Sequence, residues 1–350
     1  MGVNISDIVP SEKMELSGLS GRTLAIDAYN SIYQFLSIIR GRDGTPLKDE
    51  SGRVTSHLTG LLYRNINFLQ SGIKPAYVFD GVPSALKAQT LAERFERRTK
   101  AHDEWKRAID EGDVEKARAK ATQSTRISNE VVESSRILLT YLGLPIIQAP
   151  CEGEAQAAYM AMKGDVWAAS SQDFDSLLFG APRLVRNLNI TGRRKMPGGR
   201  EYKDIFIEEV ELEKVLKENG LENRDQLISL CILIGTDYNK GIRGIGPKKG
   251  LKLIRQYGSA SAVLEAIGEN IPNLSEVQDA FINTAITDEY SLEWKHPDVG
   301  RIIEFMCEEH GFSRKRVESS LNKLENKKRV KGDYKKPVPT KSQMSLDDWH

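Results

Sequence analysis

The chain has few cysteines, no long apolar stretch and almost no net charge, and each of these absences excludes a class of protein. Three cysteines in 350 residues, without a Cys-x-x-Cys pair, argue against a disulfide framework and fit a reducing compartment. No apolar run approaches the ~20 residues needed to span a bilayer, and the first residues lack the pattern of a signal peptide. We therefore expect no association with a membrane. A net charge of +1 does not indicate nucleic-acid binding, so such a function would depend on local clusters of charge.

Short apolar segments alternate with helical stretches, which is typical of a parallel sheet covered by helices on both faces. The predicted strands are 22–27, 75–80, 144–148, 165–172 and 183–187. Residues 86–126 are rich in charged residues and alanine, so we expect a solvated helical segment or an arch that becomes ordered on binding. The sequence from 331 is basic and interrupted by proline, as in a disordered linker. The pattern as a whole predicts an α/β fold.

Acidic residues follow the predicted strands, at the edge where ligands bind in open α/β sheets. They are Asp27, Asp80, Glu152, Glu154, Asp173, Asp175 and, after the apolar run 227–234, Asp237. Because side chains alternate along a strand, Asp173 and Asp175 are expected on one face of a strand end. Glu152 and Glu154 would converge only if a helix begins near them. Each acid taken alone is more simply explained as a helix cap or turn residue.

Seven carboxylates in one pocket cannot all be ionised without cations, so we infer bound divalent metal ions. The ligands are all oxygen atoms, with only Cys151 nearby, which favours Mg²⁺ or Mn²⁺ over Zn²⁺. Two such ions ~3.5–4 Å apart are an arrangement that hydrolyses phosphodiesters. A phosphate would need further positive charge, which Lys87 and Arg94, on one predicted helical face, could supply. Ordinary solvated helix charge explains these two residues equally well.

Residues 240–255 contain six basic residues and no acid. Within them, the run Gly-Ile-Arg-Gly-Ile-Gly-Pro-Lys-Lys at 241–249 resembles a helix-hairpin-helix turn, whose backbone N–H groups face a phosphate. Such contacts position a duplex without reading its sequence. The predicted DNA-binding residues are Gly241, Arg243, Gly244, Gly246, Lys248 and Lys249. A plain helix–helix turn is the alternative.

These motifs occur in the order found in the structure-specific 5′ nuclease family, and the chain resembles a flap endonuclease of archaeal type over nearly its whole length. The resemblance rests on runs around the seven acids, such as Ser-Gln-Asp-Phe-Asp at 171–175, and on the 241–249 hairpin. It implies a PIN-like 5′ nuclease core, a helical arch over the active site, and two Mg²⁺ ions that Mn²⁺ can replace. Lys87 and Arg94 would act on the phosphate, and Tyr33 would stack on a DNA base. Gly2 would lie near the site and belong to the DNA-binding residues.

The resemblance also implies how the acids divide between the two ions. Asp80, Glu152, Glu154 and Asp173 would mainly hold one ion, and Asp175 and Asp237 the other, with Asp27 bound to both through water. The catalytic set would be Lys87, Arg94 and Asp173. The implied substrate is double-stranded DNA with a 5′ flap, cut during Okazaki fragment processing and base excision repair, with a 5′-3′ exonuclease activity in addition.

The end of the chain resembles a peptide that binds a sliding clamp. Gln343, Leu346 and Trp349 are spaced three residues apart, although His350 stands where the family usually has a second aromatic residue. A random tail could produce the same spacing.

The expected organisation has five parts. The nuclease core comprises 1–83 and 131–225, the helical arch 84–130, the helix-hairpin-helix and C-terminal helical region 226–330, and the clamp-binding tail 331–350. We expect a monomer located in the cytoplasm with the nucleoid. The alternatives are a 5′ exonuclease or junction resolvase of the same family, a metal-dependent RNase, and a non-catalytic DNA-binding scaffold that uses the hairpin.

Overall fold

The computed structural model describes residues 2–190, 192–195 and 202–332. The predicted clamp-binding residues Gln343, Leu346 and Trp349 lie outside this part of the chain. In the described part, no helix combines the length and the apolar character that a membrane crossing requires.

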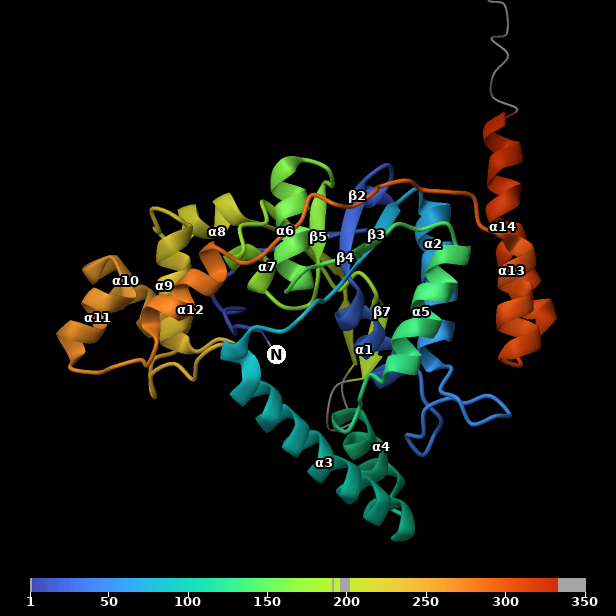
Figure 1. The fold of residues 1–350 in the computed structure, drawn as a ribbon, viewed down its shortest axis with the longest axis horizontal. Helices are drawn as coiled ribbons and strands as arrows, with labels where there is room; N and C mark the ends of the chain where they lie inside the picture. Colours follow the sequence, from blue (N-terminus) through green and yellow to red (C-terminus); the bar gives the residue numbers. More distant parts are fainter. Residues whose placement is uncertain (1, 191, 196–201, 333–350) are drawn as a thin grey trace, which may run out of the picture.

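A seven-stranded sheet of order β1-β9-β6-β5-β2-β3-β4 forms the centre of the molecule (Figure 1). Its parallel strands are β2 (Thr23–Asp27), β3 (Lys74–Phe79), β4 (Ile146–Gln148), β5 (Ala168–Ser170) and β6 (Arg183–Arg186). β9 (Ile207–Glu211) and β1 (Glu12–Met14) extend one edge in antiparallel orientation. The predicted mostly parallel α/β sheet is confirmed. The sequence pattern did not indicate β1 and β9, because their charged residues interrupt any apolar run, as is common at sheet edges.

Helices cover both faces of the sheet and bury two apolar layers. One face carries α6 (Gly153–Lys163), α7 (Asp175–Leu178), α8 (Leu212–Glu218) and α9 (Arg224–Ile234). The other carries α1 (Ala28–Ile38), α2 (Ser56–Ser71), α5 (Asn129–Tyr141), α13 (Val299–Ile303) and α14 (Arg314–Gly332). Strand residues alternate between the layers: Ala76 and Val78 face the first, whereas Tyr77 and Phe79 face the second. Two-sided burial explains why the parallel strands read as continuous apolar runs.

The charged segment between β3 and α5 forms a pair of helices that project away from the sheet, at the bottom of Figure 1. After a short 3₁₀ turn (Ala85–Lys87), α3 (Ala88–Asp110) and α4 (Val114–Gln123) pack against each other. Their buried residues are alanines, Ala101 and Ala108 on α3 and Ala117 and Ala121 on α4. The expectation of a solvated helical segment is confirmed; we call α3 and α4 the arch helices.

The C-terminal part lies on both sides of the core. α10 (Pro247–Tyr257), α11 (Ala260–Ile267) and α12 (Leu274–Ile282) pack beside α9, and a segment without helix or strand then crosses the molecule to α13 and a π-helical turn (Glu304–Glu309) (Figure 1). Several hydrogen bonds hold this crossing segment; among them, Lys295 N–H donates to Gly143 O at 2.8 Å, and Trp294 Nε1–H donates to Pro75 O at 2.7 Å. β7 (Gly192–Lys195) and β8 (Tyr202–Ile205) form a separate two-stranded antiparallel sheet.

Candidate active site

The carboxyl ends of β2 and β3 place two acids at one edge of the sheet. β2 ends at Asp27, and Asp80 directly follows β3, its neighbour in the sheet. Asp27 is buried, and its Oδ1 accepts a hydrogen bond from the backbone N–H of Asn30 at 2.9 Å. The helix-cap explanation therefore holds for Asp27. It does not exclude a second role, because capping uses Oδ1, whereas Oδ2 accepts a hydrogen bond from Ser171 Oγ at 3.5 Å.

Glu152 and Glu154 converge on the same edge because α6 begins between them. Glu152 is the N-cap residue, and Glu154 lies in the first turn. Gly153, between the two acids, donates its backbone N–H to Asp80 Oδ1 at 2.7 Å. A Cβ at residue 153 would lie 2.7 Å from that same oxygen, so a larger residue here would displace the Asp80 carboxylate. The sequence predicts that these two acids converge only if a helix begins near them, and a helix does begin there.

The expectation that Asp173 and Asp175 share one face of a strand end is wrong. β5 ends at Ser170, so both acids come after the strand, and Asp175 is the first residue of α7. They nevertheless meet, because the start of the chain lies against both. Val3 N–H donates to Asp175 Oδ1 at 2.8 Å, and a Cβ at Gly2 would lie 2.6 Å from Asp173 Cβ and 2.7 Å from Asp175 Oδ1. The expected position of Gly2 near the acids is confirmed.

Asp237 reaches the cluster from a helix rather than from the sheet. The apolar run before it is α9, and Asp237 is buried in the loop that follows. Lys87 connects it to the acids of the sheet edge: Nζ lies 2.5 Å from Glu152 Oε2 and 3.9 Å from Asp237 Oδ2. Arg94 forms a second ion pair with Asp237. All seven predicted carboxylates thus lie around one place, at the base of the arch helices.

Lys87 and Arg94 do not behave as ordinary solvated helix charges. Their side chains are only 14% and 23% exposed, and both are paired with acids of the cluster. Burial alone would lower the pKa of Lys87, but the neighbouring Glu152 and Asp237 carboxylates outweigh it and raise that pKa. Lys87 therefore stays charged and contributes positive potential where the acids meet.

The acids carry more negative charge than their surroundings compensate. Burial raises the pKa of Asp27 to about 8, and the charge of Asp80 adds to the effect. Burial also raises the pKa of Asp175 to about 7, with a further contribution from Asp173. The pKa values of Asp80 and Glu154 are raised as well, in both cases mainly by burial. Such values show that the cluster favours either bound protons or bound cations.

The donor set fits hard divalent cations. It consists of carboxylate oxygens, and Glu152 Oε1 is buried without a hydrogen-bond partner. In the described residues, however, no three acid, histidine or cysteine side chains are grouped closely enough to hold a metal ion. Lys87 and Arg94 instead pair with Glu152 and Asp237. Binding of a metal ion would therefore require these side chains to rearrange.

Known proteins resemble this chain in both sequence and fold. Residues 4–101 match the XPG N-terminal domain and residues 143–237 the XPG I-region. Flap endonuclease 1 of Pyrococcus abyssi is 50% identical over 350 residues, covering all of this chain and 98% of that protein. The chain belongs to the flap endonuclease family. Of solved structures, flap endonuclease-1 from Methanococcus jannaschii superimposes with a TM-score of 0.74 at 40% identity, over 94% of this chain and all of that one.

A more distant relative has been solved with a nucleic acid. The catalytic core of Rad2 in complex with DNA substrate superimposes with a TM-score of 0.70 at 25% identity, over 93% of this chain and all of that one. The prediction of an archaeal-type flap endonuclease with a 5′ nuclease fold is confirmed by these comparisons.

The hairpin of this family member lies between α9 and α10 and is exposed where the sequence predicted DNA contacts. Gly241 has a φ of 67°, and a Cβ there would overlap the carbonyl group of Ile234, so the turn requires glycine. Gly246 is the N-cap of α10, and Pro247 is its first residue. The exposed positions are Arg243, Gly244, Gly246, Lys248 and Lys249. Their role in DNA binding stays a prediction.

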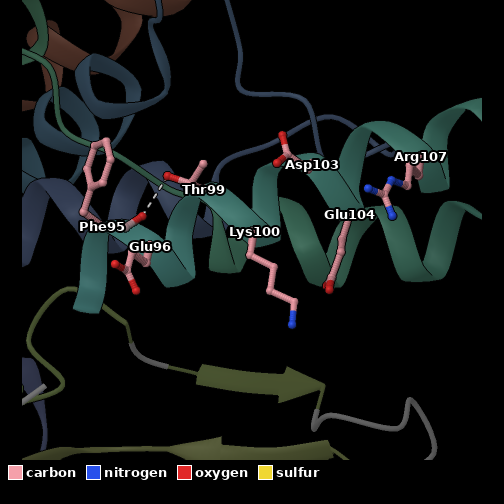
Figure 2. Close-up of a pocket in the computed structure, with 7 residues that line it drawn as sticks. All are labelled: Phe95, Glu96, Thr99, Lys100, Asp103, Glu104 and Arg107. Atoms are coloured by element: carbon pink, nitrogen blue, oxygen red, sulfur yellow. Dashed lines mark hydrogen bonds between the residues drawn. The ribbon is translucent and has the colours of Figure 1, made fainter. Parts of the chain in front are cut away.

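Two other features lie at the arch helices. Tyr33, on α1, is partly buried, and the Arg98 guanidinium lies 5.5 Å from the centroid of its ring. A hollow of about 410 Å³ runs along α3 and is lined by Phe95, Glu96, Thr99, Lys100, Asp103, Glu104 and Arg107 (Figure 2). All seven lining residues belong to one helix and none to the carboxylate cluster. We therefore do not assign this hollow to the active site.

Sequence reasoning missed the residues that bring the parts of the site together. Thr90 donates a hydrogen bond to the backbone carbonyl of Asp237, and Gly153 donates to Asp80. For Gly153 a signal was present, since glycine between two acids at a helix start allows close approach. For Thr90 there was none, because its partner lies 147 positions away.

Proposed function

We propose that the protein hydrolyses phosphodiesters at 5′ flap junctions of duplex DNA with the help of two divalent metal ions. As a member of the flap endonuclease family, it is a structure-specific 5′ flap nuclease. The observation that supports the metal-dependent chemistry is the convergence of seven carboxylates whose charge Lys87 and Arg94 only partly balance. Mg²⁺ is the proposed ion, and Mn²⁺ is the proposed substitute.

Each acid is assigned a metal ion as the sequence resemblance suggested. Asp80, Glu152, Glu154 and Asp173 would hold one ion, Asp175 and Asp237 the second, and Asp27 both through water. When bound, such a pair lowers the pKa of a water molecule and stabilises the leaving oxygen. This division of the acids rests on the resemblance; the structural observation in favour of Glu152 as a ligand is that its Oε1 is buried without a hydrogen-bond partner.

The side chains of the chain itself would orient the DNA. Lys87 and Arg94 would exchange their carboxylate partners for the phosphate and stabilise its developing charge. Tyr33 would stack on the base next to the cleaved bond, and the hairpin would hold the duplex through its backbone N–H groups. Residues 84–130 then act as an arch above the site, and this boundary, like the others predicted from the sequence, is part of the proposal.

A single labelled DNA tests the proposal. The substrate is a double flap with a long 5′ flap and a one-nucleotide 3′ flap, labelled at its 5′ end and incubated with protein in Mg²⁺. We expect one labelled product, the flap plus one nucleotide. No cleavage in Mg²⁺ or Mn²⁺, with DNA binding intact, would overturn the two-metal proposal.

The same assay separates the alternatives. Release of the label as a mononucleotide would indicate a 5′ exonuclease as the main activity. Preferential cutting of a four-way junction, assayed beside the flap, would indicate a resolvase. Cleavage of the matching RNA but not of the DNA would indicate an RNase. The exposed hairpin favours the flap activity, since a simple RNase does not need a duplex-holding element.

Replacing Gly2 by alanine should weaken metal binding. The added Cβ would push against Asp173 and Asp175, so both carboxylates must move. We expect the Mg²⁺ concentration for half-maximal cleavage to rise on the order of 10-fold, as for other changes that misorient metal ligands. Gly18→Ala is the control, because its Cβ would meet no atom closer than 4.0 Å. An unchanged Mg²⁺ titration would show that Gly2 does not position these acids.

For the end of the chain, we propose that Gln343, Leu346 and Trp349 bind a sliding clamp. The support is their spacing alone. Truncation before Gln343 should leave intrinsic flap cleavage unchanged and remove stimulation by the clamp, measured as the cleavage rate with and without clamp protein. Stimulation that survives truncation would place the clamp contact elsewhere.

The cellular role follows from the activity. We propose that the protein acts as a monomer on 5′ flaps that arise during Okazaki fragment processing and base excision repair, in the cytoplasm and at the nucleoid. The balance of endonuclease and 5′-3′ exonuclease activity would be read from the product lengths of the flap assay.

A further inference from the structure

The first turns of α3 are attached to the loop between α9 and the hairpin by side chains that no motif predicted. Thr90 Oγ1 donates a hydrogen bond to the backbone carbonyl of Asp237 at 2.8 Å. Lys240 Nζ lies 2.8 Å from Glu93 Oε1. Together with the ion pair between Arg94 and Asp237, these contacts join residues 90–94 to residues 237–240.

The spacing of the three arch residues explains why they act together. Positions 90, 93 and 94 are related by i+3 and i+4, so their side chains leave the same face of α3. That face is turned toward the loop. Beyond Arg94, the buried residues of α3 are Ala101 and Ala108, which pack within the arch rather than on the core. The base of α3 therefore depends on the loop for its position.

Hydrogen bonds within the loop and to α9 fix the conformation of the loop. Asn239 Nδ2 donates to Ile232 O at 2.8 Å, and Thr236 is bonded to Asn239 through both its N–H and its hydroxyl. Ile242 N–H donates to Leu233 O at 2.8 Å, so the hairpin is tied to the end of α9 as well. One hydrogen-bonded loop thus carries a carboxylate of the active site, the contact for the arch and the start of the hairpin.

We propose that Thr90 and the Glu93–Lys240 pair are positioning residues for the cleavage reaction. They hold the base of α3 on the loop and thereby place Lys87, just before the helix, and Arg94, within it, beside the carboxylates. This inference rests on the proposed function. It assigns these residues no contact with the DNA or with a metal ion, and they act only through the position of the two cations.

The two contacts differ in strength, which sets the size of the expected effects. The Thr90 hydrogen bond is partly buried, so Thr90→Val should lower the single-turnover rate at saturating DNA by roughly 5- to 10-fold. The Glu93–Lys240 pair is exposed, with side-chain exposures of 44% and 70%. Reversing one of its charges should lower the rate only about 2- to 5-fold, and less at high salt.

The experiment compares these variants with matched changes elsewhere in the arch. Thr90→Ser keeps the hydroxyl and should restore the rate. Glu93→Lys and Lys240→Glu should each lower it, and the double charge swap should recover it. Thr122→Val is the hydroxyl control, because Thr122 donates only to Arg118 O within its own helix. Reversal of the exposed Glu111–Lys116 pair is the charge control.

Two further readouts separate positioning from general damage. Limited trypsin digestion without DNA should cut the arch faster in Thr90→Val than in the wild type or the Thr122→Val control. Affinity for duplex DNA, measured by fluorescence anisotropy without divalent ions, should be unchanged in Thr90→Val. A rate loss that Thr90→Ser does not restore, or digestion identical to wild type, would overturn the proposal.

Failure of the proposed function would look different. If the wild type cuts no DNA, the nuclease proposal fails, but digestion of the arch still reports whether Thr90 holds α3 on the loop. If the wild type cuts flap DNA normally and neither Thr90→Val nor the charge reversals change rate or digestion, only the positioning role is wrong.

Discussion

Replacing Asp173 by alanine should abolish cleavage of flap DNA in Mg²⁺ while leaving the DNA bound. Asp173 lies in the turn after β5, against Gly2, and its charge helps to raise the pKa values of Asp27 and Asp175. Changes around metal ligands already cost about 10- to 100-fold, so loss of a ligand should lower the rate by more than about 100-fold. The measurement is a single-turnover rate on the double-flap substrate, together with an anisotropy titration of the same DNA.

A matched acid provides the control. Asp165 lies at the other end of the same strand, between α6 and β5, and is paired with Lys163 at 3.2 Å on the surface. Asp165→Ala should cut flap DNA at nearly the wild-type rate. Substantial residual turnover of Asp173→Ala in Mg²⁺ would remove Asp173 from the metal site, and loss of DNA binding would mean that its role is structural.

Replacing Asp27 by asparagine should stabilise the metal-free protein above pH 7, although it should also prevent cleavage. The pKa of Asp27 is raised from 3.8 to about 8, first by burial and then by the charge of Asp80. The folded protein therefore favours the protonated carboxyl, and this contribution to stability is complete below about pH 4 and lost as the pH rises to 8. Asparagine stays neutral, and its side-chain oxygen can still accept the Asn30 N–H that caps α1.

Thermal unfolding in EDTA at pH 5 and pH 8 tests whether stability falls as the pH rises. The wild type should lose stability between these pH values, and Asp27→Asn should lose less, with a difference on the order of 1–3 kcal/mol at pH 8. Asp175, whose pKa is raised to about 7, leaves part of the dependence in place. A wild-type protein that is equally stable at both pH values would show that the carboxylates are not buried together.

Mg²⁺ should restore the stability that the wild type loses between pH 5 and pH 8. Because protons and metal ions compete for the same carboxylates, Mg²⁺ should raise the unfolding temperature of the wild type more at pH 8 than at pH 5. The gain should be smaller in Asp27→Asn. Equal gains at both pH values would mean that the ion binds away from the acids whose pKa values are raised.

Much of the fold and the membership of the carboxylate cluster could be predicted from the sequence alone. Parallel strands buried on both faces have to be apolar throughout, so β2 and β3 are visible as runs. The carboxyl ends of such strands meet at one edge, so acids directly after them, such as Asp27 and Asp80, must come together. The turn at Gly241 could also be predicted, because the glycines of 241–249 mark it. The structure shows the reason for glycine: a side chain at residue 241 would clash with the backbone of Ile234.

Only the tertiary structure decided which groups face the acids and how each acid arrives there. Strand length depends on pairing with neighbours, so nothing local showed that β5 ends before Asp173. Lys87 meets Asp237, and Thr90 meets the same residue's carbonyl, across about 150 positions of sequence. The local pattern of apolar and polar residues does not predict such contacts. They exist because the arch helices fold back on the loop after α9, which brings distant charges to one side of the sheet.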